Sequence, residues 1–123
     1  MHSQAMKASE AGLCAGDQGK FWEMHEKIFA NQRAIAEAEL VKNAEVLGLD
    51  TKKFKECLDS GKHAEEIKKR MAEGQKAGIT GTPAFLVGYS EGDGKVKAVK
   101  RIVGAQPYAS FKTAIDELLS SKK

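Results

Sequence analysis

Along the first three-quarters of the chain, hydrophobic residues recur every three or four positions, the period of a helix that packs on one face. This spacing predicts five helices before Gly78: one with a small-residue face, an aromatic one, one over about 37–47, a fourth capped by Asp50 and a fifth running to about Ala77. Asp17 is expected to cap the aromatic helix, because its carboxylate can accept the free N–H groups of a first turn.

The aromatic helix has the widest apolar arc in the chain. An arc of this width is typical of a helix buried in a core. Its histidine, His25, is therefore expected to be a hydrogen-bonded core residue, with a pH switch or a ligand as the alternatives. The arc consists of Phe21, Trp22, Met24, His25, Ile28 and Phe29.

After Gly78 the spacing of the hydrophobic residues is no longer that of a helix. Two β-rich runs, "PAFLVG" and "KVKAVKRIVG", flank the turn cluster "SEGDGK" and predict a hairpin with a loop longer than the minimal two residues. The closing segment predicts an amphipathic helix with Pro107 in its first turn. The fold class is therefore α/β and mostly α, in a single domain, 1–123, with a helical part, 1–77, and a ββα part, 78–123. The packing face of the last helix is Tyr108, Phe111, Ile115, Leu118 and Leu119.

The amino-acid composition limits the kinds of function that the chain can have. The 123 residues are 41% hydrophobic and 30% charged, as in soluble globular proteins, and the formal net charge is only +3. Lys and Arg alternate with Glu, which is typical of solvated helix faces, so we expect no nucleic-acid partner. No apolar run approaches the length of a membrane span, and "MHSQAMKASE" lacks the apolar segment of a signal peptide. We expect neither a membrane partner nor a cofactor.

The two cysteines, Cys14 and Cys57, do not form a C-x-x-C pair. Both lie among apolar or small residues and are expected to be buried and unreactive, so two free thiols acting as small hydrophobes remain one interpretation. A zinc site that combines them with His2, His25 or His63 matches no standard ligand spacing. We therefore expect no metal.

Five segments, taken in order, resemble the DsbA-like thiol–disulfide oxidoreductases, whose thioredoxin fold carries an inserted helical domain. The resemblance covers nearly the whole chain and implies an incomplete thioredoxin-like fold: a helical subdomain, then a cis-proline loop, a β-hairpin and a C-terminal helix. It also implies that the family's first strand, its C-x-x-C helix and its second strand are missing. The segments are "HSQAMKASEAGLCA", "GKFWEMHEKIFANQ", "FKECLDSGK", "GITGTPAFLVG" and "IVGAQPYASFKTAIDELL".

The resemblance assigns substrate binding to Gly81, Thr82 and Pro83, in a loop where the residue before a cis proline pairs with bound peptide. Read without it, "GTPAF" leaves a cis bond and a trans proline at the start of a strand equally open. Some family members also carry a disulfide inside the helical domain. Cys14 and Cys57 fall where that disulfide would be.

These observations suggest a truncated oxidoreductase domain that has no redox activity as this chain, although its family is enzymatic. The alternatives are a non-catalytic peptide-binding module, which would use the Thr82–Pro83 loop and an exposed strand edge, and a purely structural protein. Because the missing strands leave one edge of strand 84–87 open, we expect a homodimer through that edge. The resemblance implies a periplasmic or extracytoplasmic location, and a chain that naturally starts at Met1 would remain cytoplasmic.

Overall fold

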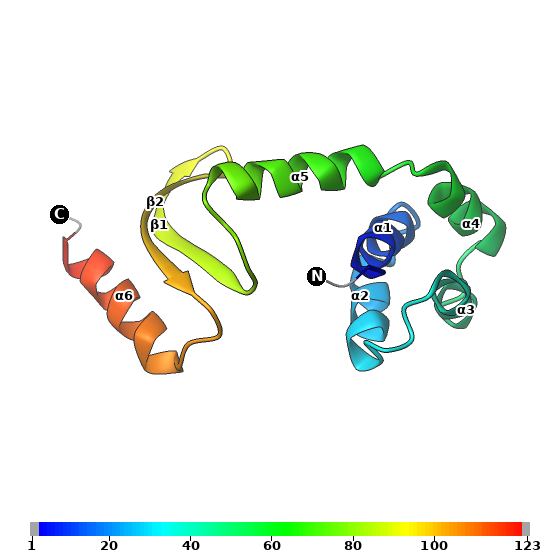
Figure 1. Ribbon diagram of the computed structural model, residues 1–123, viewed down its shortest axis with the longest axis horizontal. Helices are drawn as coiled ribbons and strands as arrows, with labels where there is room; N and C mark the ends of the chain where they lie inside the picture. Colours follow the sequence, from blue (N-terminus) through cyan, green and yellow to red (C-terminus); the bar gives the residue numbers. More distant parts are fainter. Residues whose placement is uncertain (1–2, 122–123) are drawn as a thin grey trace. The chain divides into compact units, whose positions relative to one another are not determined.

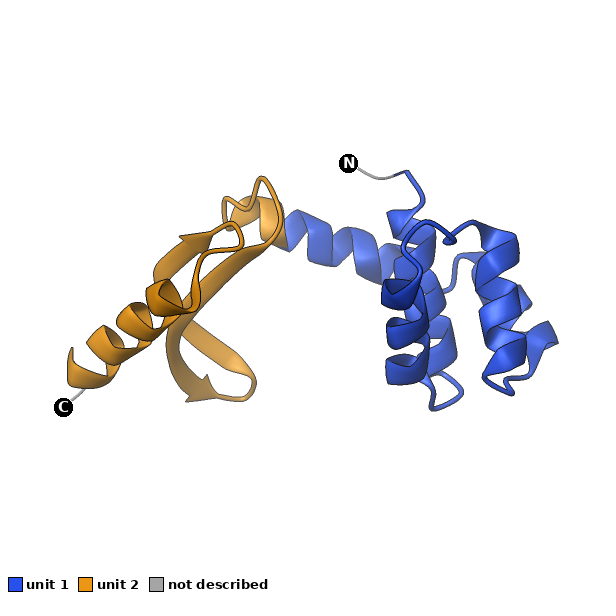
Figure 2. Cartoon of the chain, turned by 90° about the horizontal axis from the view of Figure 1, so that it is seen from below, with its two compact units in different colours: residues 1–73 blue, residues 74–123 orange. Residues whose placement is uncertain are grey.

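The computed structural model describes residues 3–121, which form six helices and one two-stranded antiparallel sheet in the order α1–α5, β1, β2, α6 (Figure 1). The chain divides into two compact units, residues 1–73 and residues 74–123 (Figure 2). The predicted order of five helices, a hairpin and a helix is confirmed, as is the mostly helical α/β class. None of the helices within residues 3–121 is both long enough and apolar enough to cross a bilayer.

The first unit is built from α1, Ala5–Gly16, packed against three further helices, and its core lies between them. Glycines on α1 allow a close approach: a Cβ added at Gly12 or at Gly16 would lie 3.3 Å from the side chain of Phe21. The other helices are α2, Phe21–Ala30; α3, Glu37–Val46; α4, Thr51–Ser60; and α5, Ala64–Lys76, which belongs to this unit up to Glu73. The core residues are Ala8, Ala11, Cys14, Ala15, Met24, Leu40, Ala44, Phe54 and Leu58.

Helix caps give one confirmed prediction and one wrong one. Asp50 is the N-cap of α4, and its Oδ1 accepts the backbone N–H of Lys53 at 3.1 Å. Asp17 does not cap α2, which begins at Phe21 with Lys20 at its N-cap. Gly19, with φ of +77°, adds a turn between them. Asp17 therefore lies too early in the chain to reach the free N–H groups of α2.

The aromatic face of α2 is not the core face that was predicted. Of its six arc residues only Met24 is buried, whereas Trp22 is 67% exposed and Phe29 is 60% exposed. His25 is half-buried and lies among aromatic rings, with its ring centroid 4.7 Å from that of Phe29 and 5.3 Å from that of Trp22. The core of this unit is filled by α1, α3, α4 and Met24, so the remaining aromatic side chains stay at its surface.

In the second unit, β1, Ala84–Gly92, pairs antiparallel with β2, Lys95–Val103. The prediction of a longer loop was wrong, because the strands extend into the turn cluster and only Asp93 and Gly94 connect them. Both have positive φ, 52° and 73°, as a tight two-residue hairpin turn of this hand requires. The register shifts between Val87 and Gly88 and again near the turn. At the first shift the strands approach so closely that a Cβ on Gly88 would lie 1.9 Å from the carbonyl oxygen of Lys97.

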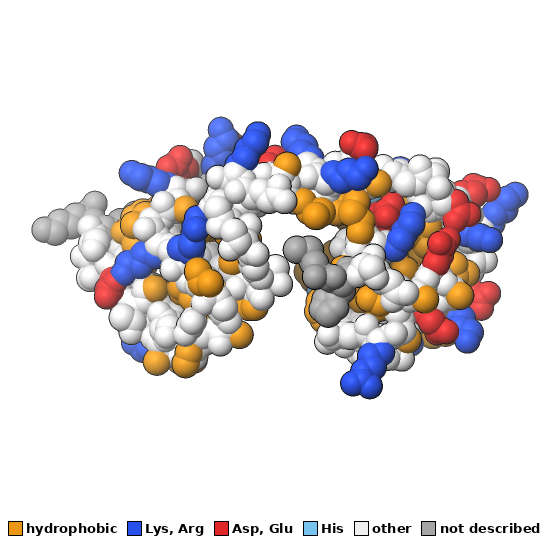
Figure 3. All heavy atoms as spheres, in the orientation of Figure 1, with side chains coloured by type: hydrophobic (Ala, Val, Ile, Leu, Met, Phe, Trp, Pro, Cys, Tyr) orange, Lys and Arg blue, Asp and Glu red, His pale blue; other side chains and the backbone are white. Residues whose placement is uncertain are grey.

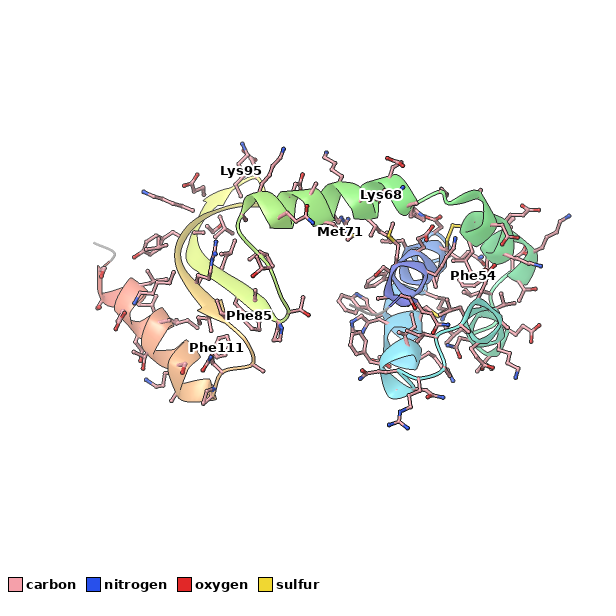
Figure 4. The ribbon with its side chains drawn as sticks, viewed as in Figure 1. Phe54, Lys68, Met71, Phe85, Lys95 and Phe111 are labelled. Carbon is pink, nitrogen blue, oxygen red and sulfur yellow. A yellow bond between two sulfur atoms is a disulfide. The ribbon has the colours of Figure 1, made fainter. Side chains whose placement is uncertain are left out.

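Helix α6, Tyr108–Ser121, covers one face of this hairpin. Phe85 of β1 meets Phe111 of α6 edge to face, with ring centroids 4.9 Å apart (Figure 4), and Tyr89 donates its hydroxyl to the carbonyl oxygen of Leu118 at 2.7 Å. The predicted packing face was too wide. Leu118 is buried, but Tyr108 is 80% exposed and Leu119 and Ile115 are also exposed, because a two-stranded sheet is too narrow to cover the whole apolar arc.

Candidate functional site

The Gly81–Thr82–Pro83 segment lies in the connection between α5 and β1, within the second unit. Helix α5 is followed by a turn with a left-handed glycine, Gly78, and the N–H of Ile79 donates to the carbonyl oxygen of Gly74 at 2.9 Å. The segment then runs over the surface to β1, and all three of its residues are exposed. The Thr82–Pro83 peptide bond is cis.

Both ends of this connection are tied by hydrogen bonds to β2 or to the residue that follows it. The guanidinium group of Arg101 donates to the carbonyl oxygen of Gly78 at 3.2 Å and to that of Ala77. At the other end, the N–H of Gly104 donates to the carbonyl oxygen of Pro83 at 2.9 Å. Among the described residues, the backbone N–H and C=O of Thr82 make no hydrogen bond. The loop is therefore held in place by its neighbours while Thr82 keeps its polar backbone groups free.

The register shows which backbone groups of β1 point away from β2. Because Gly104 donates to Pro83, these two residues occupy a hydrogen-bonded position of the antiparallel ladder. Such positions alternate with non-hydrogen-bonded ones, so Phe85 and Val87 bond to β2. The N–H and C=O groups of Ala84 and Leu86 point to the opposite edge, where no strand pairs with them within residues 3–121.

The side chains along this edge are uncharged from residue 84 to residue 90. Leu86 is 46% exposed on the sheet face opposite α6, where Val103 is also exposed. Hydrophobic side chains are visible on the surface of both units (Figure 3). An uncharged edge with free backbone groups and no proline within it favours pairing with another extended chain.

The two cysteines are joined. Cys14 Sγ and Cys57 Sγ are 2.05 Å apart, which confirms the disulfide that the resemblance implied and leaves no free thiol among the described residues (yellow bond in Figure 4). Cys14 is buried, as predicted, but Cys57 is only half-buried. It lies on α4 where that helix faces solvent as well as α1. The disulfide links α1 to α4 inside the first unit.

Beside the disulfide, Asp17 is the centre of a polar cluster. Its Oδ2 lies 2.8 Å from Lys62 Nζ, 2.8 Å from His63 Nε2 and 3.8 Å from Cys57 Sγ. The hydrogen bond from Lys62, followed by the hydrogen bond and charge of His63, lowers the pKa of Asp17, although partial burial opposes the shift. Sequence reasoning missed this cluster. Asp17 is 45 and 46 positions from Lys62 and His63, so no local spacing signals it.

Of the two candidate histidine ligands within residues 3–121, His63 is the one that the fold brings to the cysteines. One ligand atom each of Cys14, Cys57 and His63 lie within 4.8 Å of one another. His25 lies instead among the aromatic rings of α2, and His2 is outside the described residues. This trio comes from two helices and the turn after α4, so no sequence motif of ordinary ligand spacing signals it.

The first unit also has an apolar groove of about 460 Å³ between α1, α2 and the part of α5 that belongs to this unit. Sequence reasoning assigned several of its side chains to a core. A helical period tells which residues share a face but not whether the chain supplies anything to cover that face. The groove is lined by Ala8, Ser9, Gly12, Leu13, Phe21, His25, Ile28, Phe29, Ile67, Arg70 and Met71.

Residues 1–116 match the model of one protein family, the DSBA-like thioredoxin domain. Similar segments occur in Na⁺/H⁺ antiporters: NhaA 1 of Salinispora arenicola is 39% identical over 87 residues, NhaA 3 of Salinispora tropica 37% over 87 residues, and NhaA of Herminiimonas arsenicoxydans 36% over 86 residues. These matches cover 70–71% of this chain but only 13–14% of each antiporter, so the chain spans a small fraction of these relatives. No solved structure matches.

Proposed function

Since the chain belongs to the DSBA-like thioredoxin domain family, we propose that it supplies the polypeptide-binding half of a thiol–disulfide oxidoreductase domain. The binding surface is the Gly81–Pro83 loop together with the outer edge of β1. The observation that carries the proposal is the alternation of hydrogen-bonded and non-hydrogen-bonded positions along β1. In this alternation the N–H and C=O groups of Ala84 and Leu86 point away from β2.

Strand addition is the physical mode of binding that this edge favours. An extended polypeptide beside β1 would exchange backbone hydrogen bonds with Ala84 and Leu86, and Thr82 would extend the row at its start. Backbone hydrogen bonds carry little sequence preference, and the uncharged side chains from residue 84 to residue 90 do not repel either sign of charge. The preferred ligand is therefore an extended or unfolded segment rather than a folded surface.

We infer that these 123 residues do not carry out thiol exchange by themselves. The reaction needs an accessible thiolate of low pKa and a second cysteine that resolves the mixed disulfide. The two cysteines present are bonded to each other, and there is no C-x-x-C pair. In an insulin-reduction assay we expect no turnover above a protein-free blank, and measurable turnover would contradict this inference. The Cys14–Cys57 disulfide supports a location where disulfides persist, outside the cytoplasm.

The binding proposal is tested by titrating an unstructured peptide into isotope-labelled protein. We expect NMR shift changes concentrated in residues 80–87. Leu86→Pro removes an outward N–H without removing a β1–β2 hydrogen bond, and should weaken binding by about tenfold. Val103→Pro is the matched control, because the N–H of Val103 points to the other edge of the hairpin. Absence of shifts at millimolar peptide, or equal effects of the two prolines, would refute the binding site.

A second copy of the chain is the other candidate for the same edge. Two β1 edges related by a twofold axis would form a four-stranded antiparallel sheet, and both copies would use the same surface. Light scattering at micromolar concentration tests this homodimer. We expect the wild type to have twice the mass of the monomer. Leu86→Pro should halve this mass, and excess peptide should also reduce it. A monodisperse wild-type monomer would exclude the dimer and leave the peptide site standing.

A further inference from the structure

Four side chains with metal-binding atoms meet in the first unit, next to the disulfide. Cys14 comes from α1, Asp17 from the turn that follows it, Cys57 from α4, and His63 from the turn before α5. His63 Nε2 lies 2.8 Å from Asp17 Oδ2, which is 3.8 Å from Cys57 Sγ. The side chain of His63 is only 15% exposed, so it is held in the cluster.

We propose that reduction of the Cys14–Cys57 disulfide converts this cluster into a Zn²⁺ site, with Cys14, Cys57, His63 and Asp17 as its four ligands. Reduction by a trialkylphosphine consumes one water, gives the phosphine oxide and leaves two thiols. Binding of one Zn²⁺ then releases both thiol protons as the Zn–S bonds form. The oxidised chain has no thiolate to offer and does not form the site.

The ligand set suits zinc. Two thiolates, an imidazole and a carboxylate are typical tetrahedral zinc ligands. In a tetrahedron with ordinary Zn–S and Zn–N bond lengths, the two sulfurs lie about 3.8 Å apart and each sulfur lies about 3.5 Å from the nitrogen. One ligand atom each of Cys14, Cys57 and His63 already lie within 4.8 Å of one another. Once the disulfide is opened, rotations of the cysteine side chains can separate the two sulfurs to the distance that a tetrahedral site needs.

The surrounding charges also permit a divalent cation. The two thiolates and Asp17 would carry three negative charges, and Glu56 and Glu66 add two more nearby. Lys53 and Lys62 oppose them. Lys62 now pairs with Asp17, but its side chain is 58% exposed and can turn into solvent when the carboxylate binds the metal.

Such a site would keep α1 and α4 linked in either redox state. The disulfide joins them covalently under oxidising conditions, and Zn²⁺ would join them through the same two sulfurs under reducing conditions. Because structural zinc contributes directly to folding free energy, the reduced unit should gain stability when the metal binds.

The test compares oxidised and phosphine-reduced full chain, freed of excess reductant, with Zn²⁺ alone and then with Co²⁺ as probes. Native mass spectrometry should show one Zn²⁺ bound to the reduced chain, with the mass of two protons lost, and none bound to the oxidised chain. Co²⁺ should give thiolate-to-metal charge-transfer bands and the intense visible bands of a tetrahedral site. Circular dichroism follows helicity throughout.

His63→Ala is the decisive variant, because it leaves both cysteines and their disulfide in place. We expect it to weaken Zn²⁺ binding to the reduced chain by more than about 100-fold, and Asp17→Asn by about tenfold. His25→Ala, in the aromatic cluster of α2, is the matched control and should bind like the wild type. If the reduced chain loses helicity, Zn²⁺ should restore it in the wild type but not in His63→Ala. Failure to bind or to refold with Zn²⁺, or binding indifferent to His63, overturns the proposal.

Discussion

The two units of this chain differ in how completely they bury their own apolar side chains. In the helical unit, eight of the core residues, Phe54 among them, are at most 1% exposed. The hairpin unit buries three hydrophobic residues, Ile102, Ala114 and Leu118, each still 7–8% exposed. The first unit closes a core around α1. In the second unit, α6 covers one face of a two-stranded sheet, and residues 74–121 supply no cover for the other face or for the two edges.

This difference follows from the secondary structure of each unit. Helices satisfy their backbone groups internally, so three of them around a glycine- and alanine-rich helix can form a core without further partners. A hairpin leaves half of its backbone groups at its edges and is marginally stable without additional strands or packing. The helical unit can therefore act as a scaffold, while the hairpin unit has the surface that accepts another chain.

The largest loss of stability is expected from a substitution in the core of the helical unit, where the side chains are most completely buried. Phe54→Ala should reduce the free energy of unfolding by about 3–5 kcal/mol, because it leaves a cavity in a fully buried site. Phe85→Ala, at a ring that is 39% exposed against Phe111, should have a clearly smaller effect. Urea denaturation followed by circular dichroism and by residue-specific NMR signals measures both. Equal losses would contradict the claim that the two units are packed differently.

The disulfide should affect one unit and not the other. Replacing both Cys14 and Cys57 by Ala removes a link across 43 positions, which is expected to cost roughly 3–4 kcal/mol. With a chelator present, the unfolding midpoint of the helical signals should fall, and the amide signals of β1 and β2 should keep their positions. A loss of hairpin signals in the double variant would show that the hairpin depends on the helical core.

Within the hairpin, Gly88 tests the close approach of the strands. Gly88→Ala would place a Cβ 1.9 Å from the carbonyl oxygen of Lys97, so the strands must separate, at a cost of about 1–3 kcal/mol. Gly81→Ala is the control for stability, since no heavy atom lies within 4 Å of the added Cβ. Amide exchange in β1 and β2 reports the result. A hairpin unaffected by Gly88→Ala would contradict the register.

The smallest effect concerns pH and the polar cluster at the disulfide. Because the pKa of Asp17 is lowered in the folded chain, chiefly by Lys62, its stabilising contribution is present above the unfolded value near 3.8 and is lost as the pH falls through the folded pKa. Asp17→Asn should slightly lower stability at neutral pH and flatten the loss of stability below about pH 4. Asp59→Asn, at an exposed residue with no ion pair among the described residues, serves as control. Identical pH profiles for the two variants would contradict this role of Asp17.

Local signals in the sequence were sufficient for the order of elements and for the cap of α4. Asp50 caps the helix that starts next to it, and Gly78 ends α5, because both effects act within one turn. The hairpin turn also had a local signal, since Asp93–Gly94 is a typical two-residue turn, but the surrounding polar cluster obscured where the strands end.

Non-local arrangements could not be predicted in this way. Nothing near Asp17 indicates that Lys62 and His63 will lie beside it, and nothing in the apolar arc of α2 indicates that Trp22 and Phe29 stay exposed. The candidate site was predicted in part: the resemblance indicated Thr82–Pro83 and the cysteine pair. The outward direction of the Ala84 and Leu86 backbone groups depends on the strand register, which requires the structure.

The most direct test of the account is residue-resolved hydrogen exchange of the monomer, measured without and with an extended peptide. We expect slow exchange in the helical core and measurable protection of Phe85 and Val87, whose amides bond to β2. Ala84 and Leu86 should exchange fast in the free monomer and about tenfold more slowly at nine-tenths saturation with peptide. Protection of Ala84 and Leu86 in the free monomer, or exchange that the peptide leaves unchanged, would contradict the claim that the outer edge of β1 is the binding surface.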